Sequence, residues 1–201
     1  MTDLETSGDI VGVHEILEIG LVVFNQQTGE VLDTLSVKVK PLHIENAVPA
    51  ALARNGYNEK DWEHALTLKE ATTLYAEKTN SAVFCAFNAT FDWGFMSDAF
   101  RQTGVVDTMD YHRLDLLSIA WEKGLKHEES WSLKHTCELF SIPPEPDVHS
   151  ALNGAMAGYE LFKKFQDKEN IAIQEILKAS REVKEGNVLQ GDLKRLAKDS
   201  I

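Results

Sequence analysis

Residues 16–39 read ILEIGLVVFNQQTGEVLDTLSVKV, two runs of strand-forming residues on either side of a turn. The first run, 16–24, is dense in Ile, Leu, Val and Phe. Residues 35–39 alternate apolar and polar side chains with a period of two, which is typical of a half-exposed strand. Residues 27–30 include a glycine and supply the turn. The stretch therefore predicts a β-hairpin, which ends at Pro41.

Helical patterns and one apolar run follow the hairpin. Thr67 and Glu70 fit a capping box, which predicts a helix that runs to about Lys78. Residues 82–87 form a continuous apolar run that is typical of a buried strand. Further helices are predicted over 91–102, closed by Gly104, and over 114–122 and 133–140. A hairpin followed by alternating helix and strand predicts an α/β domain with three layers and a mixed sheet.

The composition is that of an ordinary globular protein. The chain has 201 residues, of which 43% are hydrophobic and 26% are charged. No apolar run is long enough to span a bilayer, and the start, MTDLETSGDI, lacks the basic and apolar regions of a secretory signal. We expect a cytoplasmic protein without a membrane partner, in which Cys85 and Cys137 are buried thiols.

The absence of linkers and repeats predicts one domain over residues 1–167. Residues 168–201 are charged and contain only short apolar stripes, so we expect a helical C-terminal extension there. The net charge of −12 argues against broad nucleic-acid binding, which needs a basic surface. It does not exclude a nucleic-acid enzyme, because metal-binding carboxylates themselves add negative charge.

Asp3 and Glu5 form a D-x-E pair near the start of the chain. On a strand, side chains two residues apart point to the same face. Two neighbouring carboxylates repel each other unless a cation lies between them, so the pair is a candidate site for a hard divalent metal. The alternative is an exposed acidic N-terminus, and the pair by itself favours that alternative.

Asp92 follows the buried run 82–87 and falls in the first turn of the next predicted helix. Ligand sites of open α/β sheets gather at the carboxyl ends of buried strands. The alternative is helix capping by Asp92 or Asn88. Capping explains one aspartate well, but it does not explain the other acidic positions.

His149 lies at the start of a strong helical pattern, VHSALNGAMAGYELFKKF, over residues 148–165. A single histidine is more often structural than catalytic. Its pKa near neutrality nonetheless suits it to act as a general base that activates water.

Three motifs occur in order along the chain: the D-x-E pair with Thr6-Ser7-Gly8, then F-N-A-x-F-D over residues 87–92, then H-x-A-L from His149. A strand that reads H-E-I-L-E-I-G lies between the first two. This order resembles the DEDD-h family of 3′–5′ exonucleases, the group of DnaQ-like proofreading subunits, RNase T and oligoribonuclease-type enzymes. The resemblance covers residues 3–165 and implies an RNase H-like fold with a five-stranded mixed sheet, in which the D-x-E strand is central.

The resemblance also implies a mechanism. Two Mg²⁺ or Mn²⁺ ions would bridge the scissile phosphate, held by Asp3, Glu5 and Asp92, and His149 would take a proton from the attacking water. The products would be nucleoside 5′-monophosphates, cut from the 3′ end of single-stranded DNA or RNA. The terminal nucleotide would contact four residues, namely Leu4, Thr6, Asn88 and Phe91. Some relatives form homodimers or bind a polymerase, but the sequence predicts neither partner here.

The chain departs from the family pattern H-x-A-x-x-D, because Gly154 stands where the last aspartate belongs. The fourth metal-binding carboxylate is therefore missing. Asn153 lies about 100° around the helix and is a weaker ligand. Asp147 and a metal-bound water are the other candidates to replace the missing carboxylate. If the missing ligand weakens the site, the substitution Gly154→Asp should enhance activity.

A second departure is that only Met1 and Thr2 precede Asp3, whereas the family has several strand residues there. A strand cut short in this way would leave its neighbours without ladder partners, which is costly when they are buried. A misplaced start codon would explain the departure equally well.

Two functions remain open from the sequence. The first is a metal-dependent 3′–5′ exonuclease, working or partly impaired by Gly154. The second is a catalytically inactive relative that binds 3′ ends or nucleotides, or that serves as a protein-interaction module. His149 favours the first, because a protein that only binds needs no general base. An unrelated structural protein would require three motifs to coincide.

Overall fold

The computed structural model describes residues 1–143 and 149–166. It divides the chain into two compact units, Met1–Phe162 and Lys163–Ile201, and the fold described below is that of the first unit. The expected extension over residues 168–201, and Asp147, lie outside the described residues. None of the described helices is both long and apolar enough to cross a membrane.

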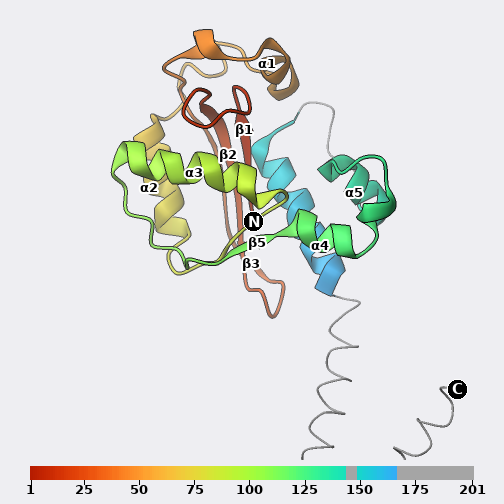
Figure 1. The fold of residues 1–201 in the computed structure, drawn as a ribbon. Helices are drawn as coiled ribbons and strands as arrows, with labels where there is room; N and C mark the ends of the chain where they lie inside the picture. The colour runs from red at the N-terminus through yellow and green to blue at the C-terminus, as the bar shows by residue number, and fades with distance from the viewer. Residues whose placement is uncertain (144–148, 167–201) are drawn as a thin grey trace, which may run out of the picture. The chain divides into compact units, whose positions relative to one another are not determined.

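Strands and helices alternate after an N-terminal hairpin (Figure 1). The strands are β1 (Thr2–Thr6), β2 (Ile16–Phe24), β3 (Val31–Lys38), β4 (Phe84–Ala86) and β5 (Arg113–Asp115). The helices are α1 (Pro49–Asn55), α2 (Leu68–Lys78), α3 (Ala89–Thr103), α4 (Leu116–Glu122), α5 (Leu133–Leu139) and a last helix over residues 151–166, with short 3₁₀ turns at Ile44–Asn46 and Leu125–His127.

The sequence patterns locate most of these elements. The hairpin is β2 and β3, with Gly29 in the left-handed region at φ 72° in its turn. Thr67 and Glu70 form the predicted capping box of α2, which ends at Lys78. Gly104 closes α3 at φ 70°. Cys85 and Cys137 are buried and neither is in a disulfide, as expected.

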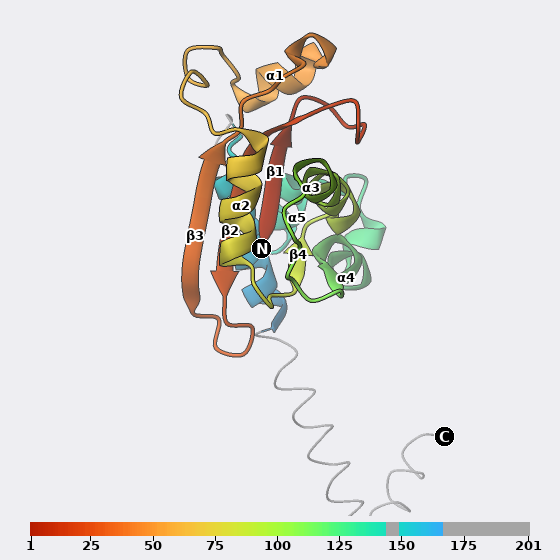
Figure 2. The ribbon, with the colours of Figure 1, turned by 90° about the vertical axis from the view of Figure 1, so that its left-hand side faces the viewer.

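The five strands form two separate sheets, which differs from the single five-stranded sheet that the family resemblance implies. β1, β2 and β3 make an antiparallel sheet in that order, and β4 and β5 make a parallel pair. β4 lies beside β1 (Figure 2). At the edge of β1 that faces away from β2, the amide of Leu4 donates to the Asp92 carboxylate.

The main core lies between the antiparallel sheet and helices α2 and α3. Alternate residues of the strands, such as Leu4, Ile19 and Leu21, face this core, where Tyr75 of α2 and Met96 of α3 are fully buried. The opposite face of the sheet is covered by the last helix, drawn blue behind the sheet in Figure 2. The first unit therefore has the predicted helix–sheet–helix layers.

The last helix approaches the sheet closely at a glycine of β2. A β-carbon at Gly20 would lie 2.0 Å from the carbonyl carbon and oxygen of Ala151. Further along the helix, the rings of Tyr159 and Phe162 pack against Phe24, with centroids 5.0 and 4.9 Å away. The absence of a side chain at Gly20 therefore sets how near the helix can lie to the strands.

The start of β1 remains paired even though few residues precede Asp3. The Met1 ammonium nitrogen donates to the Val22 carbonyl at 2.7 Å, and the Val22 amide donates back to Met1 at 2.8 Å. The pairing of β1 with β2 then continues from Thr2 to Thr6. The expected loss of ladder partners therefore does not occur along this stretch.

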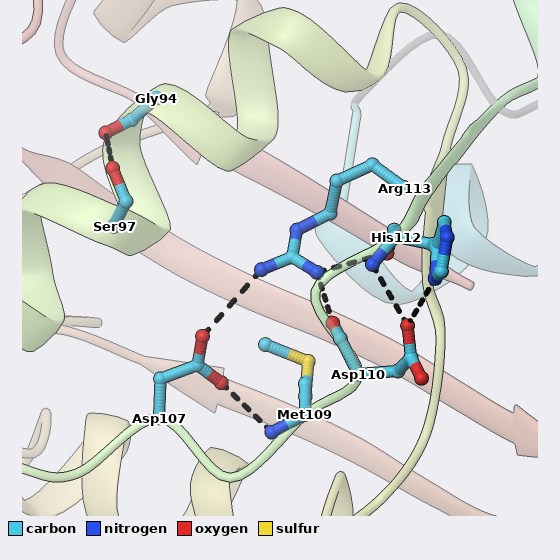
Figure 3. A network of polar contacts seen from close by, with 7 residues as sticks. All are labelled: Gly94, Ser97, Asp107, Met109, Asp110, His112 and Arg113. Carbon is cyan, nitrogen blue, oxygen red and sulfur yellow. Dashed lines mark hydrogen bonds and ion pairs between the residues drawn. The ribbon is translucent and has the colours of Figure 1, made fainter.

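Arg113 fixes the segment that leads into β5 (Figure 3). Its guanidinium donates to the carbonyls of Asp110 and His112, and it stacks over Trp93 of α3 with the guanidinium carbon 3.5 Å from the ring centroid. Two residues later, the Asp115 carboxylate accepts from the Ala89 amide at 2.9 Å. These contacts fix the first turn of α3, which carries Asp92.

The close approach at Gly20 predicts that Gly20→Ala destabilises the protein, because the added methyl group would meet backbone that cannot rotate away. Overpacking of this kind costs about 1–3 kcal/mol of the free energy of unfolding. Chemical denaturation measures the loss. Gly94→Ala in α3 is the matched control, because its β-carbon would meet a single Val11 methyl group at 3.1 Å and Ala favours a helix. Equal stability of the two variants would contradict the packing argument.

Candidate active site

Asp3 and Glu5 lie on the face of β1 that is covered by the last helix. Asp3 pairs with Gly20 and Glu5 with Glu18 across the ladder, so Glu5 and Glu18 are side by side on one face. Glu5 and Glu18 are both buried. Carboxylates in this position are not an exposed acidic terminus, and each needs a partner to offset its desolvation.

Asp92 reaches from α3 to the middle of the D-x-E pair. Its Oδ1 accepts a hydrogen bond from the Leu4 amide at 3.0 Å, and the residue is only 3% exposed. Leu4 is at a position where the strand amide points away from β2, because Met1 and Val22 exchange hydrogen bonds and the pattern alternates along the ladder. Asp92 is thus hydrogen-bonded to the backbone of Leu4, which lies between Asp3 and Glu5.

The charge on Asp92 is unfavourable in this environment. Burial raises the pKa of its carboxyl well above the ordinary value, and the nearby charges of Glu5 and Asp115 raise it further, against the lowering effect of the bond from Leu4. Asn88 is the N-cap of α3 but its side chain makes no capping hydrogen bond. The carboxylate of Asp92 is directed to β1, which simple capping of α3 would not require.

The first turn of the last helix is held over the acidic strand. The Ala151 amide donates to Oε2 of Glu18 at 3.1 Å, so a buried carboxylate of β2 occupies the positive end of the helix. Gly154 follows one turn later, against Asp3: a β-carbon there would lie 2.3 Å from Asp3 Oδ2. The position of the missing carboxylate is therefore adjacent to the D-x-E pair.

His149 precedes this turn and is half-buried. Its amide donates to the Arg54 carbonyl of α1 at 3.4 Å. Burial lowers the pKa of its imidazole below the ordinary 6.5, and the positive charges of Arg54 and Lys134 lower it further. The imidazole is therefore neutral at pH 7 and able to accept a proton.

A pocket of about 400 Å³ opens beside these residues. Leu4, Thr6 and Phe91, three of the residues predicted to contact substrate, line it. Asn88, the fourth, does not line this pocket and is exposed. The remaining lining residues come from β1, the loop after it and α1: Glu5, Gly8, Asp9, Val48, Ala50, Ala51, Arg54 and Asn55.

The donor set fits a hard divalent cation in its chemistry. Asp3, Glu5 and Asp92 offer carboxylate oxygens, the ligands that Mg²⁺ and Mn²⁺ prefer. Within the described residues, no three His, Cys, Asp or Glu side chains already surround a common point that would hold an ion. The carboxylates would have to turn toward one another to enclose one, which the repulsion between them opposes until a cation is present.

The sequence patterns missed two parts of this site. Helix α1 supplies Arg54 and Asn55, and the Asn55 amide donates to the Thr6 carbonyl at 2.9 Å. Pro49 at its first position and Gly56 just after it, at φ 63°, are start and stop signals that could have located it. The second missed residue is Glu18. Its signal is a charged side chain within an apolar strand, because such a side chain has to be buried with a partner.

Comparison with known proteins found similar sequences. The family model described as Exonuclease, of the RNase T type, matches residues 1–162. The 3′–5′ DNA exonuclease Cap18 of Escherichia coli is 30% identical over 182 residues, which cover 84% of this chain and 93% of Cap18. Ribonuclease T of Shewanella frigidimarina is 29% identical over 174 residues, 80% of this chain and 78% of the relative.

Solved structures show the same fold at low identity. E. coli exonuclease I in complex with a dT13 oligonucleotide superposes with a TM-score of 0.68 at 15% identity, over 88% of this chain and 42% of exonuclease I. A 3′-exonuclease whose structure concerns 3′-end specific recognition of the histone mRNA stem-loop gives a TM-score of 0.63 at 16% identity. The match covers 83% of this chain and 80% of that exonuclease. The fold is therefore α/β and RNase H-like, and the chain belongs to the RNase T-type family of exonucleases.

Proposed function

We propose that this chain is a metal-dependent 3′–5′ exonuclease that acts on single-stranded DNA or RNA and releases nucleoside 5′-monophosphates. The observation that carries the proposal is the hydrogen bond from Leu4 to Asp92, which brings a third carboxylate to the D-x-E pair. The family supports the reaction class, and the names of Cap18 and ribonuclease T support DNA and RNA as the candidate substrates.

In this proposal Asp3, Glu5 and Asp92 hold Mg²⁺ or Mn²⁺. The bound ions would offset the charge of the scissile phosphate and stabilise the attacking and leaving oxygens. The protein's own contribution is to keep the carboxylates together in a buried position. The burial that raises the pKa of Asp92 also strengthens its attraction for a cation, because screening by water is weak there.

His149 is the proposed general base. Its neutral imidazole takes a proton from the attacking water as the phosphorus–oxygen bond to that water forms. The bond between phosphorus and the 3′ oxygen of the preceding nucleotide then breaks, and that oxygen leaves with its electron pair. Burial, and to a smaller extent the charges of Arg54 and Lys134, lower the pKa of the imidazole and favour its neutral form before the reaction.

The pocket beside β1 is the proposed binding site of the terminal 3′ nucleotide. Leu4 and Phe91 offer apolar surface to a base or sugar, and the Thr6 hydroxyl donates to the Gly8 carbonyl at 2.6 Å, which fixes the loop at one wall. Arg54 supplies positive charge to the phosphate. We assign no substrate contact to Asn88.

The inactive relative is the second candidate, and the observation that favours it is Gly154 at the place of a metal ligand. A protein of this kind would bind oligonucleotides through the same pocket without shortening them. Binding and trimming must therefore be measured on the same preparation.

The direct test is trimming of 5′-labelled single-stranded DNA and RNA oligonucleotides. We expect a ladder that shortens from the 3′ end with Mg²⁺ or Mn²⁺ and stops with EDTA. His149→Ala should lower the rate about 10²–10⁴-fold, the usual contribution of a positioned general base. Oligonucleotides blocked at the 3′ end are the control. Binding without trimming by the parent protein, with either ion, would favour the inactive relative.

The lowered pKa of His149 predicts the pH dependence of trimming. A base with a lowered pKa keeps its reactive neutral form to lower pH, so the acidic limb of kcat/KM should have its midpoint below 6.5. Lys134→Gln removes a positive charge that lowers this pKa and lies outside the pocket lining, so it should move the midpoint upward. An unchanged midpoint in Lys134→Gln, or a parent midpoint above 6.5, would argue against His149 as the base.

The raised pKa of Asp92 predicts how stability responds to pH and metal. Because the folded state disfavours the ionised carboxyl, that ionisation costs stability as pH rises above the ordinary value of 3.8. Without metal, Asp92→Asn should therefore unfold at a higher temperature than the parent at pH 8, and the difference should shrink at acidic pH. Mn²⁺ at a hundred times its dissociation constant should stabilise the parent by about 2.7 kcal/mol. Mn²⁺ should stabilise Asp92→Asn far less than the parent. Equal stabilisation of the two proteins would show that Asp92 is not a metal ligand.

A further inference from the structure

Gly154 and Asp3 occupy one small space between the last helix and β1. A β-carbon at position 154 would lie 2.3 Å from Asp3 Oδ2, 2.5 Å from its Cγ and 3.0 Å from its Oδ1. The first two distances are shorter than real contacts of a β-carbon, the third is very tight, and Gly154 is buried. The Asp3 carboxylate therefore lies where a side chain of residue 154 would begin.

The helix cannot simply move away to make room. Its first turn is bonded to Glu18 through the Ala151 amide at 3.1 Å, and its backbone lies directly on Gly20. One turn beyond position 154, a β-carbon at Gly158 would lie 2.9 Å from the Met1 sulfur, so the helix is close to β1 there as well. If a side chain were added at position 154, the helix backbone would therefore stay in place and the side chain of Asp3 would have to move.

We propose that Gly154 is a positioning residue for Asp3, and that the site is built for three carboxylates because the space of the fourth is taken up by Asp3 itself. The inference rests on the proposed function only in treating Asp3 as a metal ligand. Any side chain at position 154, aspartate included, would displace the Asp3 carboxylate. The family pattern leads to the opposite expectation, that Gly154→Asp restores a missing ligand.

The experiment compares Gly154→Ala with Gly154→Asp, because alanine adds the β-carbon without a carboxylate. Met156→Ala is the control, since Met156 is exposed on the same helix and is not part of the proposed site. Mn²⁺ affinity is measured by titration with detection of the free ion by electron paramagnetic resonance. We expect both Gly154 variants to bind Mn²⁺ about tenfold or more weakly than the parent, as for other losses of ligand positioning. Tighter binding by Gly154→Asp, with parent-like binding by Gly154→Ala, would overturn the proposal.

A double-mutant cycle tests the steric contact without metal or substrate. Gly154→Ala should lower the midpoint of thermal unfolding in EDTA, although alanine is the better helix former. In an Asp3→Ala background, where the obstructing atoms are absent, the same change should no longer lower it. If Gly154→Ala does not fold by itself but folds with Asp3→Ala, the contact is supported. Equal effects in both backgrounds would overturn the contact.

The cycle also separates this inference from the proposed function. If the parent protein neither binds Mn²⁺ nor trims oligonucleotides, the proposed function fails, while the coupling between positions 3 and 154 is still measured by thermal unfolding. If the parent trims and the two positions show no coupling, the proposed function stands and the role of Gly154 is overturned.

Discussion

The close packing of the last helix on the β1–β2 pair is the constraint on which the site depends. Gly20 lets the helix backbone lie against β2, and Glu18 holds the helix through the Ala151 amide. Position 149 is two residues before this anchor and position 154 is three residues after it, so the same contact places both. A side chain at Gly20 would clash with this backbone and disturb the contact that positions both the proposed base and the surroundings of Asp3.

Buried acids impose the second constraint. Glu5, Glu18 and Asp92 are each less than 9% exposed, and their charges oppose folding unless they are offset. Glu18 is offset by the end of a helix, and Asp92 in part by the Leu4 amide. The raised pKa of Asp92 shows that its compensation is incomplete. A cation bound at the proposed site would offset this unfavourable charge. Stability without metal and the proposed metal binding therefore make opposite demands on the same carboxylates.

The elements that could be predicted from the sequence are those with strong local signals. The capping box located the start of α2, and the hairpin and α3 followed from periodicity and glycine positions. Asp3, Glu5, Asp92 and His149 could be selected because the motif order resembles a known family. The helix predicted over 114–122 was wrong at its start, because Leu114 and Asp115 belong to β5 and α4 begins at Leu116. The three residues of β5 pair with β4, a contact that the local pattern does not reveal. Glu18, Arg54 and the space shared by Gly154 and Asp3 are tertiary facts, which arise only when segments distant in sequence pack together.

The acidity of the chain bears on how a polyanionic substrate is held. The pocket lining contains one arginine, Arg54, and two acidic residues, Glu5 and Asp9. The lining is therefore net negative although Arg54 offers one positive charge to a phosphate, and the net charge of −12 repels a nucleic acid at long range. Divalent cations held by the carboxylates, as proposed, would reverse the sign of the charge locally and leave the rest of the surface repulsive. Attraction that is confined to one point gives no broad affinity along a strand, so the same acidity that argues against broad nucleic-acid binding is compatible with the proposed removal of single nucleotides from a 3′ terminus.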